Sequence, residues 1–181
     1  MEIVPDVNWW CGATRFRVGY DHATADWNTR MRAIQTVLAI GPAAGVRLHT
    51  GPHVLENIVE ALSAPDVSAR SVTRPAWHPW DISMFLDMVH QAVAASGGRD
   101  DVEAVAHHRA NEVNRDNRFP DGEDYQVLYL AVAAGATVLA TGDGDLLALR
   151  RHGMVDVWPS AELDDEIAAC YARHRRQQET A

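Results

Sequence analysis

The sequence predicts an α/β fold, in which a central parallel sheet of short strands is flanked by helices. Short apolar runs of strand length alternate along the chain with longer stretches of helical periodicity, which is the pattern of such folds. The chain has 181 residues, 47% of them hydrophobic and 23% charged, so it can bury a sizeable core without disulfides. Because no repeat, low-complexity tract or linker divides it, we predict a single domain over residues 1–181.

Two strands and three helices are predicted before residue 100. The strands are expected at 2–5 and 46–50, and the helices at 21–40, 52–62 and 81–95. Gly41-Pro42 supplies the stop of the first helix, and Gly51-Pro52 opens the second. The apolar positions of these two helices are Trp27, Met31, Ile34, Val37 and Leu38 in the first, and Leu55, Ile58, Val59 and Leu62 in the second.

The C-terminal third again alternates helices and strands. Helices are predicted at 121–135, 146–151 and about 160–178, with strands at 137–141 and 154–158. Ser160 is the expected N-cap of the last helix. Its predicted inward residues are Leu163, Ile167, Cys170 and Tyr171. Residues 102–119 have no clear period, and we assign no element to them.

Composition excludes some classes of protein and leaves others open. The net charge of −9 argues against a broad basic surface for nucleic acid, but suits clustered carboxylates that hold a cation, or a basic partner protein. The two cysteines are far apart, which excludes a disulfide scaffold or a cysteine zinc site and suits the cytoplasm. No apolar run approaches the roughly 20 residues of a membrane span, and we expect no signal peptide.

Acidic residues follow two of the predicted strands. Asp6 ends the first strand, and Asp143 comes directly after the strand at 137–141, with Asp145 two residues later. Ligands of open α/β sheets lie beyond the carboxyl ends of the strands, where both positions fall. For the "GDGD" turn alone, a helix N-cap is the more common explanation. Asp6 is harder to explain in this way, since an unpaired charge near a buried strand is costly.

Two further carboxylates are predicted at the same edge of the sheet. Glu56 lies in the first turns of its helix, from which side chains lean back toward the N-terminus, and Asp124 stands just before an apolar helix. Each also has a simpler explanation as an acid that favours a helix N-terminus. Together, however, five carboxylates from four segments would repel one another unless a cation joined them. Mg²⁺ and Mn²⁺ are oxygen-seeking ions that suit such a site.

Three segments resemble the motifs of PIN-domain nucleases. "EDYQVLYLAVAAGATVLATGDGDLLALRRHGMVDVWPSAEL" (123–163) resembles their C-terminal half, with its acid opening a helix and its TGD-x-DLL turn. "IVPDVNWW" (3–10) resembles their first motif, and "LHTGPHVLENIVEAL" (48–62) their second. The likeness is greatest to the bacterial VapC-type toxins. Pro5 and Val7 depart from the usual pattern of the first motif.

The resemblance implies a PIN-like three-layer fold and an assignment of the acids. Asp6, Glu56, Asp124 and Asp143 would form the catalytic acidic quartet, with Asp145 as a further metal ligand. Asp121 is an alternative to Asp124. Asn8 and Thr141 would be polar supports near the metal. The implied activity is Mg²⁺- or Mn²⁺-dependent cleavage of RNA by the toxin of a toxin–antitoxin pair, with a cognate antitoxin and a homodimer as partners.

Other residues and other functions remain open at this stage. Arg150 and Arg151 follow the acidic turn and are candidates for contacts with RNA phosphates, although a dipole-favoured position is equally consistent. Trp77 and Trp80 are expected to pack in the protein rather than stack on bases. One alternative function is a catalytically silent PIN-like module that binds RNA or protein. Another is a metal-dependent nuclease that cuts DNA or a particular nucleic-acid structure.

Overall fold

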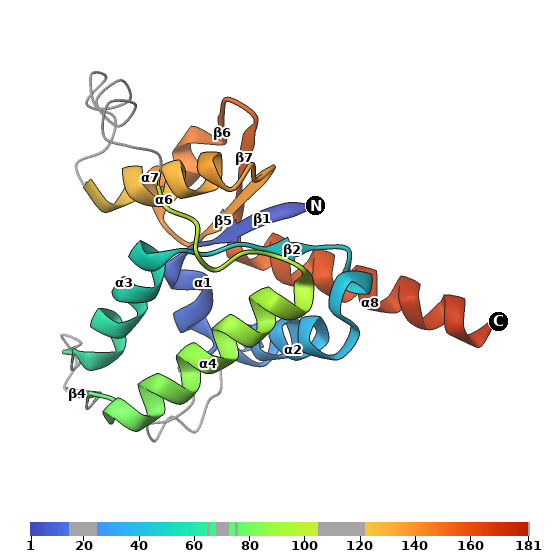
Figure 1. Ribbon diagram of the computed structural model, residues 1–181, viewed down its shortest axis with the longest axis horizontal. Coiled ribbons are helices and arrows are strands. Elements are labelled where there is room, and N and C mark those ends of the chain that lie inside the picture. The colour runs from blue at the N-terminus through green and yellow to red at the C-terminus, as the bar shows by residue number, and fades with distance from the viewer. Residues whose placement is uncertain (15–24, 65, 68–72, 75, 105–121, 181) are drawn as a thin grey trace.

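The computed structural model describes residues 1–14, 25–64, 66–67, 73–74, 76–104 and 122–180. Within these residues, a five-stranded sheet has the strand order β2-β1-β5-β7-β6 (Figure 1). Its neighbouring strands are parallel except for β6, which pairs antiparallel with β7 at one edge. The strands are β1 (Glu2–Pro5), β2 (Arg47–Leu48), β5 (Val138–Thr141), β6 (Arg151–His152) and β7 (Val155–Pro159). The predicted α/β class with a mostly parallel sheet is therefore confirmed.

Helices cover both faces of this sheet (Figure 1). They are α1 (Val7–Gly12), α2 (Ala25–Ile40), η1 (Gly41–Ala44, a 3-10 helix), α3 (Pro52–Ser63), α4 (Pro79–Ser96), α6 (Gly122–Ala133), α7 (Gly144–Leu149) and α8 (Ser160–Glu179). A small hairpin, β3 (Asp66–Val67) and β4 (Thr73–Arg74), lies outside the sheet. None of the described helices is both long and apolar enough to cross a membrane.

The connections divide the helices between the two faces. Helices α6 and α7 lie over one face, and α1, α2, α4 and α8 lie over the other, while α3 stands near the end of β1 (Figure 1). The central strands β1 and β5 are neighbours, yet the chain leaves β1 into α1 and leaves β5 into α7, on opposite faces. In an open α/β sheet, the crevice between two such strands is the usual place for a ligand. Asp6 and Asp143 follow these two strands.

The central strands are buried because they are apolar on both faces. All four residues of β5 and three of the four in β1 are buried. A continuous apolar run of this kind is typical of a parallel strand covered by helices on both sides. Ile3, Val4 and Leu139 have no exposed surface, and the core extends from them into both helical layers.

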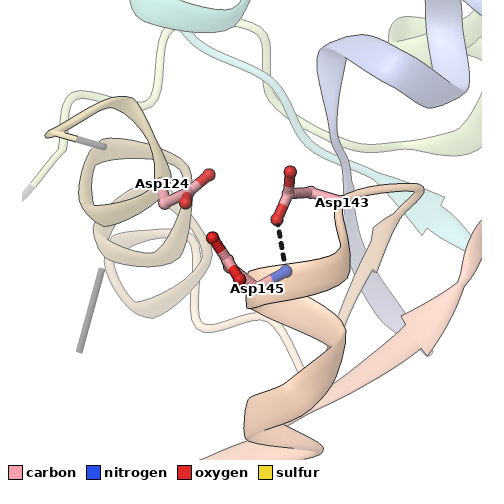
Figure 2. A group of neighbouring side chains, drawn as sticks. All are labelled: Asp124, Asp143 and Asp145. Carbon is pink, nitrogen blue, oxygen red and sulfur yellow. Dashed lines mark hydrogen bonds between the residues drawn. The ribbon is translucent and has the colours of Figure 1, made fainter. Parts of the chain in front are cut away.

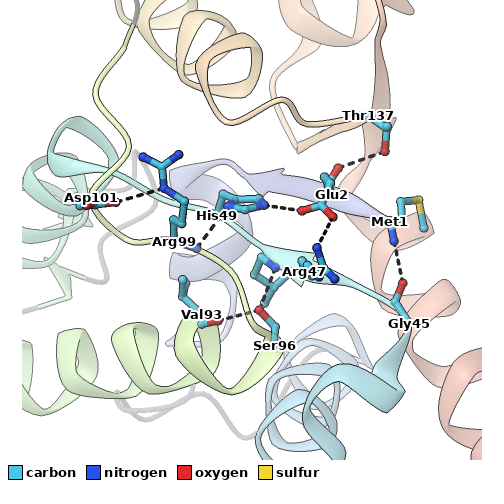
Figure 3. Close-up of polar contacts among 11 residues, drawn as sticks. Met1, Glu2, Gly45, Arg47, His49, Val93, Ser96, Arg99, Asp101 and Thr137 are labelled. Atoms are coloured by element: carbon cyan, nitrogen blue, oxygen red, sulfur yellow. Dashed lines mark hydrogen bonds and ion pairs between the residues drawn. The ribbon is translucent and has the colours of Figure 1, made fainter.

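Polar contacts with the start of β1 hold the edge strand β2 in place (Figure 3). The backbone N–H of Arg99 donates to Nδ1 of buried His49 over 3.2 Å, so the ring proton lies on Nε2 and is donated to Glu2 over 2.7 Å. This bond and Arg47 lower the pKa of Glu2. Just beyond, a Cβ on Gly51 would lie 1.9 Å from the Val102 carbonyl oxygen, so only glycine allows this close approach at the start of α3.

Some predicted boundaries were wrong for local reasons. No helix was expected after Asp6, but α1 begins at Val7, because six residues are too few to display a helical period. Helix α7 begins at Gly144 rather than at residue 146, since Asp143 is its N-cap. Ser160 was predicted to cap α8 but is its first residue, and Pro159 occupies the cap position. Residues 21–24 of the first predicted helix and 105–119 lie outside the described residues.

The predicted apolar faces also needed correction. Leu38, Val59 and Tyr171 have 37%, 37% and 40% of their surface exposed, although each belonged to a predicted apolar or inward set. In α3 the buried stripe is Val54, Ile58 and Leu62, at intervals of four residues. The buried face of α3 therefore includes Val54 in place of the predicted Leu55 and Val59. Trp80, expected to pack, is 68% exposed, whereas Trp77 packs edge-on against Phe85 at 6.0 Å.

A buried ion pair joins three helices of one layer. The Arg30 Nε of α2 lies 3.0 Å from Asp164 of α8, and the Trp9 indole of α1 donates to the same carboxylate over 3.0 Å. Arg30 also donates to the Trp9 carbonyl oxygen over 3.1 Å. A Cβ on Gly12 would lie against the Arg30 guanidinium, so a larger residue there would require this side chain to shift from its ion pair. Burial raises the pKa of Asp164 even though Arg30 opposes that change.

We predict that Arg30→Met lowers the free energy of unfolding by about 3–5 kcal/mol, because it leaves a buried carboxylate without its cation. Arg30→Met/Asp164→Asn should cost less than the sum of the two single changes. Urea denaturation measures these values. The control is Arg175→Met, which breaks the exposed Arg175–Glu179 pair and should cost only about 0–1 kcal/mol. Equal costs for the two arginines would contradict the prediction.

Candidate metal centre

A cleft of about 330 Å³ opens at the carboxyl edge of the sheet. It lies where α1 and α7 diverge, and residues of α3 and α6 complete its walls. The lining residues are Asp6, Val7, Asn8, Asn57, Glu60, Ala61, Asp124, Val127 and Asp143. Three of the predicted acids and one predicted support, Asn8, therefore meet in one cleft. The remaining predicted support, Thr141, lies directly beneath it in β5.

Asp6 is the buried member of this group, with 6% of its surface exposed. As the N-cap of α1 it accepts from the Val7 N–H over 2.6 Å, and it also accepts from the Thr141 hydroxyl over 2.7 Å. Asn8 contributes a longer contact of 3.4 Å. Burial raises the pKa of Asp6, and the nearby charge of Asp143 raises it further, while these hydrogen bonds act in the opposite direction. Asp6 is thus held in one orientation at a position unfavourable for its charge.

The Thr141 hydroxyl links Asp6 to the acidic turn after β5. It donates to Asp6, and it accepts from the backbone N–H of Asp143 over 2.9 Å. Thr141 has no exposed surface, so water cannot replace these bonds. The ends of β1 and β5 are therefore connected through one buried hydroxyl, and the position of Asp143 depends on Asp6.

Asp124, Asp143 and Asp145 converge at the mouth of the cleft (Figure 2). One carboxylate oxygen from each lies within 4.8 Å of the others. Asp143 caps α7, accepting from the Asp145 N–H over 2.7 Å and from the Leu146 N–H over 3.1 Å. Asp124 comes from the first turn of α6. Asp121, the alternative to Asp124, lies outside the described residues.

The helix N-termini offset part of the repulsion among these three carboxylates. The N-termini of α6 and α7 carry partial positive charge and favour acids in their first turns. That effect explains each aspartate singly, and it is worth only about 0.3–1 kcal/mol at an exposed site. It does not explain why acids from two helices converge on one point. The convergence would suit a hard divalent cation, because Mg²⁺ and Mn²⁺ prefer carboxylate oxygens and keep several waters.

The structure does not bring Glu56 to this cleft. Glu56 is exposed, and α3 contributes Asn57, Glu60 and Ala61 to the lining instead. Glu56 lies two residues before buried Ile58 and Glu60 lies two residues after it, so both lie nearly opposite the core but on different flanks of the helix. Sequence reasoning missed Asn57 and Glu60, because helical periodicity alone does not show which flank of the apolar stripe faces the cleft.

Arg150 and Arg151 lie at the opposite edge of the sheet from the acids. Arg151 belongs to β6 and pairs in register with Asp156, which itself lies beside Val138 at the start of β5. Its guanidinium contacts Asp156 over 3.3 Å. Arg150 is exposed at the end of α7, with a positive φ of 57°. Neither arginine lines the acidic cleft, so a role in contacting RNA there is not supported by their positions.

No model of a known protein family matches the chain, and no curated protein sequence matches it.

We predict that Asp6→Asn stabilises the metal-free protein at neutral pH. Because the pKa of Asp6 is raised by folding, its ionised form opposes folding increasingly as pH rises through that pKa. The neutral amide removes this cost and remains a good N-cap. Thermal unfolding in the presence of a chelator should show a gain in Tm above the folded-state pKa. The gain should shrink toward acid pH, where the aspartate is itself protonated.

The matched control for this change is Asp101→Asn, at a side chain that is 78% exposed. It should change Tm little at any pH. An effect of Asp6→Asn that did not vary with pH would contradict the electrostatic explanation.

We also predict that Mg²⁺ or Mn²⁺ stabilises the wild-type protein in proportion to its occupancy. The gain should reach about 2.7 kcal/mol when the free ion is about 100 times its Kd. Asp143→Asn keeps the cap but removes a charge, and should abolish most of this gain, as should Asp124→Asn. Metal titrations followed by thermal unfolding measure it. Asp101→Asn should respond like the wild type, whereas an unchanged response in Asp143→Asn would exclude this metal site.

Proposed function

We propose that this chain is a metal-dependent endoribonuclease with a PIN-like fold, acting as the toxin of a toxin–antitoxin pair. The observation that carries the proposal is the convergence of Asp124, Asp143 and Asp145 within 4.8 Å at the carboxyl edge of the sheet. The motifs "IVPDVNWW" and "TGDGDLL", which resemble those of PIN-domain nucleases, supply the acids of this edge. Fold, motif and acid cluster thus support the same activity.

The residues present fit a hard divalent cation. Asp124, Asp143 and Asp145 offer carboxylate oxygens from two helices, and Asp6 lies behind them in the same cleft. Oxygen-only donors of this kind suit Mg²⁺ or Mn²⁺ rather than zinc. When bound, such an ion lowers the pKa of a coordinated water and offsets the negative charge that develops on a phosphodiester.

The other cleft residues have separate tasks in this proposal. Asp6, oriented by Val7 and Thr141, keeps a carboxylate aimed at the centre, and its raised pKa suits it to hold a proton. The amides of Asn8 and Asn57 can donate hydrogen bonds to phosphate or sugar oxygens of RNA. Val7, Ala61 and Val127 provide apolar wall that limits the access of water. No covalent enzyme intermediate is needed.

The α3 carboxylate of the proposed quartet is better assigned to Glu60 than to Glu56. Glu60 lines the cleft and Glu56 does not, although both side chains are exposed. A helix presents residues about four apart on the same side, so Asn57 and Ala61 share this wall with Glu60. Glu60→Gln should therefore lower cleavage more than Glu56→Gln, and the reverse order would restore the original assignment.

The proposed partners follow from charge. A chain with net charge −9 and an acidic cleft repels RNA phosphates until a cation occupies the site. The same negative charge suits a basic partner protein, and a cognate antitoxin of that kind is part of the proposal. Mg²⁺ or Mn²⁺ is thus expected to control RNA binding as well as cleavage.

The decisive experiment is cleavage of a mixed RNA pool by the purified, partner-free protein. We expect cutting with Mg²⁺ or Mn²⁺, none with EDTA, and a rate at least roughly 100-fold lower in Asp143→Asn. Even residues that merely orient metal ligands contribute about 10–100-fold. Asp101→Asn serves as the matched control and should cut like the wild type.

A DNA pool of the same sequences separates the proposed ribonuclease from a DNA nuclease. If folded protein binds RNA but cuts neither pool with any metal, the chain is a binding module and the proposal fails. Cutting that persists in EDTA would equally reject the metal mechanism.

A further inference from the structure

The side chains that line the acidic cleft offer many hydrogen-bond acceptors and few donors. Of the nine described lining residues, four are carboxylates, three are apolar, and the other two are Asn8 and Asn57. An ionised carboxylate accepts hydrogen bonds and donates none. Among the described lining residues, the side-chain N–H groups are therefore those of the two asparagines alone.

Each asparagine already donates one of its N–H groups to a neighbouring side chain. Asn8 Nδ2 lies 3.4 Å from Oδ2 of Asp6, and Asn57 Nδ2 lies 3.2 Å from Nε2 of His53. Because an amide nitrogen only donates, Nε2 of His53 accepts, and its ring proton lies on Nδ1. Within the described part of the chain, no group donates to the carbonyl oxygen of Asn8 or of Asn57. Both oxygens are thus available to accept from a bound molecule.

A ligand that satisfies this cleft has to bring hydrogen-bond donors. The phosphodiester oxygens of a nucleic acid accept but do not donate. The sugar–phosphate backbone of DNA has no donor, whereas that of RNA has one, the ribose 2′-hydroxyl. With a volume of about 330 Å³, the cleft is at the lower end of the roughly 300–1,000 Å³ of ligand pockets, so it suits one sugar and its phosphate. The 2′-hydroxyl is the donor that such a unit supplies.

Asn57 is better placed than Asn8 to accept this hydroxyl. Asn8 is on α1 beside the buried acid, and its amide supports Asp6. Asn57 lies on α3, one turn after His53 on the same side of the helix, so the imidazole ring holds its amide in one orientation. Its carbonyl oxygen can accept the hydroxyl proton, which leaves its second N–H for a phosphate or sugar oxygen.

We propose that Asn57 is a specificity-determining residue, whose carbonyl oxygen accepts the ribose 2′-hydroxyl and so makes this chain prefer RNA to DNA. His53 is its positioning residue. This role rests on the proposed function, because it requires a nucleic acid phosphate at the acids of the same cleft. With DNA bound, the Asn57 oxygen has no donor, and a site that hydrogen-bonds a substrate hydroxyl discriminates against the analogue that lacks it.

The size of the preference follows from the chemistry. Hydrolysis by water breaks the same phosphorus–oxygen bond in RNA and in DNA, so removal of one 2′-hydroxyl weakens a contact without removing a reactant. The expected loss in kcat/KM is therefore finite, between about 5-fold and 100-fold, as for a hydrogen bond that loses one partner. A 2′-hydroxyl that itself attacked the phosphorus would instead abolish cleavage when removed.

The test combines two forms of the protein with ribose and deoxyribose forms of one substrate. The substrate is an RNA oligonucleotide that carries a site cut in the mixed pool. Two copies of it have 2′-deoxyribose on one side or on the other side of the cut bond. With Mg²⁺ or Mn²⁺, the wild type should lose about 5-fold to 100-fold in kcat/KM on one copy. Asn57→Ala should cut the RNA more slowly and should cut the RNA and that copy at nearly equal rates.

A matched control removes an amide elsewhere. Gln91→Ala changes an exposed position of α4 and should keep the wild-type preference. Equal rates of the wild type on the RNA and both copies would overturn the proposal and leave the ribonuclease function standing. A preference that persists in Asn57→Ala, or complete loss of cleavage on one copy, would also overturn it.

Failure of the proposed function gives a different result. If the folded wild type cuts neither RNA nor DNA, the preference is measured as binding, by fluorescence anisotropy of single-stranded RNA and DNA of one sequence in the same ions. Tighter binding of RNA that is lost in Asn57→Ala would support the role of Asn57 without a nuclease. Equal binding of RNA and DNA, or binding of neither, would overturn it.

The role of His53 is tested through the same ratio of RNA to deoxyribose-copy cleavage. His53→Leu frees the Asn57 amide to rotate and should lower this ratio, whereas a loss of stability would lower both rates alike. His53→Gln offers a carbonyl oxygen to the same N–H and should restore the ratio at least in part. An unchanged ratio in His53→Leu would overturn the positioning role of His53.

Discussion

The buried carboxylate of Asp6 is the constraint on which the functional edge of this protein depends. It ends the central strand, caps α1 and accepts the Thr141 hydroxyl, which in turn accepts the Asp143 N–H. A carboxylate at this depth is tolerated only if its hydrogen bonds are complete. Satisfying them fixes where the chain turns after β1 and after β5, and therefore where the crevice between these strands opens.

Each acid at this crevice occupies a common position for an acid, at a helix N-terminus, but the convergence of several acids on one point is unusual. Asp143 caps a helix, and Asp124 and Asp145 lie in first helical turns, where the dipole favours them. What distinguishes the site is that the N-termini of α6 and α7 point at the same place (Figure 2). The fold thereby concentrates negative charge beside a buried aspartate whose pKa is already raised. A hard cation would relieve this arrangement, and among the described residues no other cluster of acids, histidines and cysteines has the geometry to hold one.

Helix α8 forms ion pairs in two settings, one buried in the core and one exposed to solvent. On its buried side Asp164 meets Arg30 and the Trp9 indole, where loss of one partner is costly and the geometry of three helices is specified. On its exposed side, single ion pairs such as Arg175–Glu179 contribute little to the stability of the fold. The buried face of α8 therefore contributes more to the stability of the fold than its exposed face.

The sequence by itself determined the α/β class, most strands and helices, and the positions of Asp6, Asp124, Asp143 and Asp145 at one edge of the sheet. Apolar runs, glycine-proline stops and residues at strand ends are local signals, and they were sufficient for this. Only the tertiary structure decided that Glu60 rather than Glu56 lines the cleft and that Arg150 lies away from it. The direction of a helical side chain depends on which face packs, and that is decided by distant partners. The pairing of Arg30 with Asp164, 134 residues apart, has the same origin.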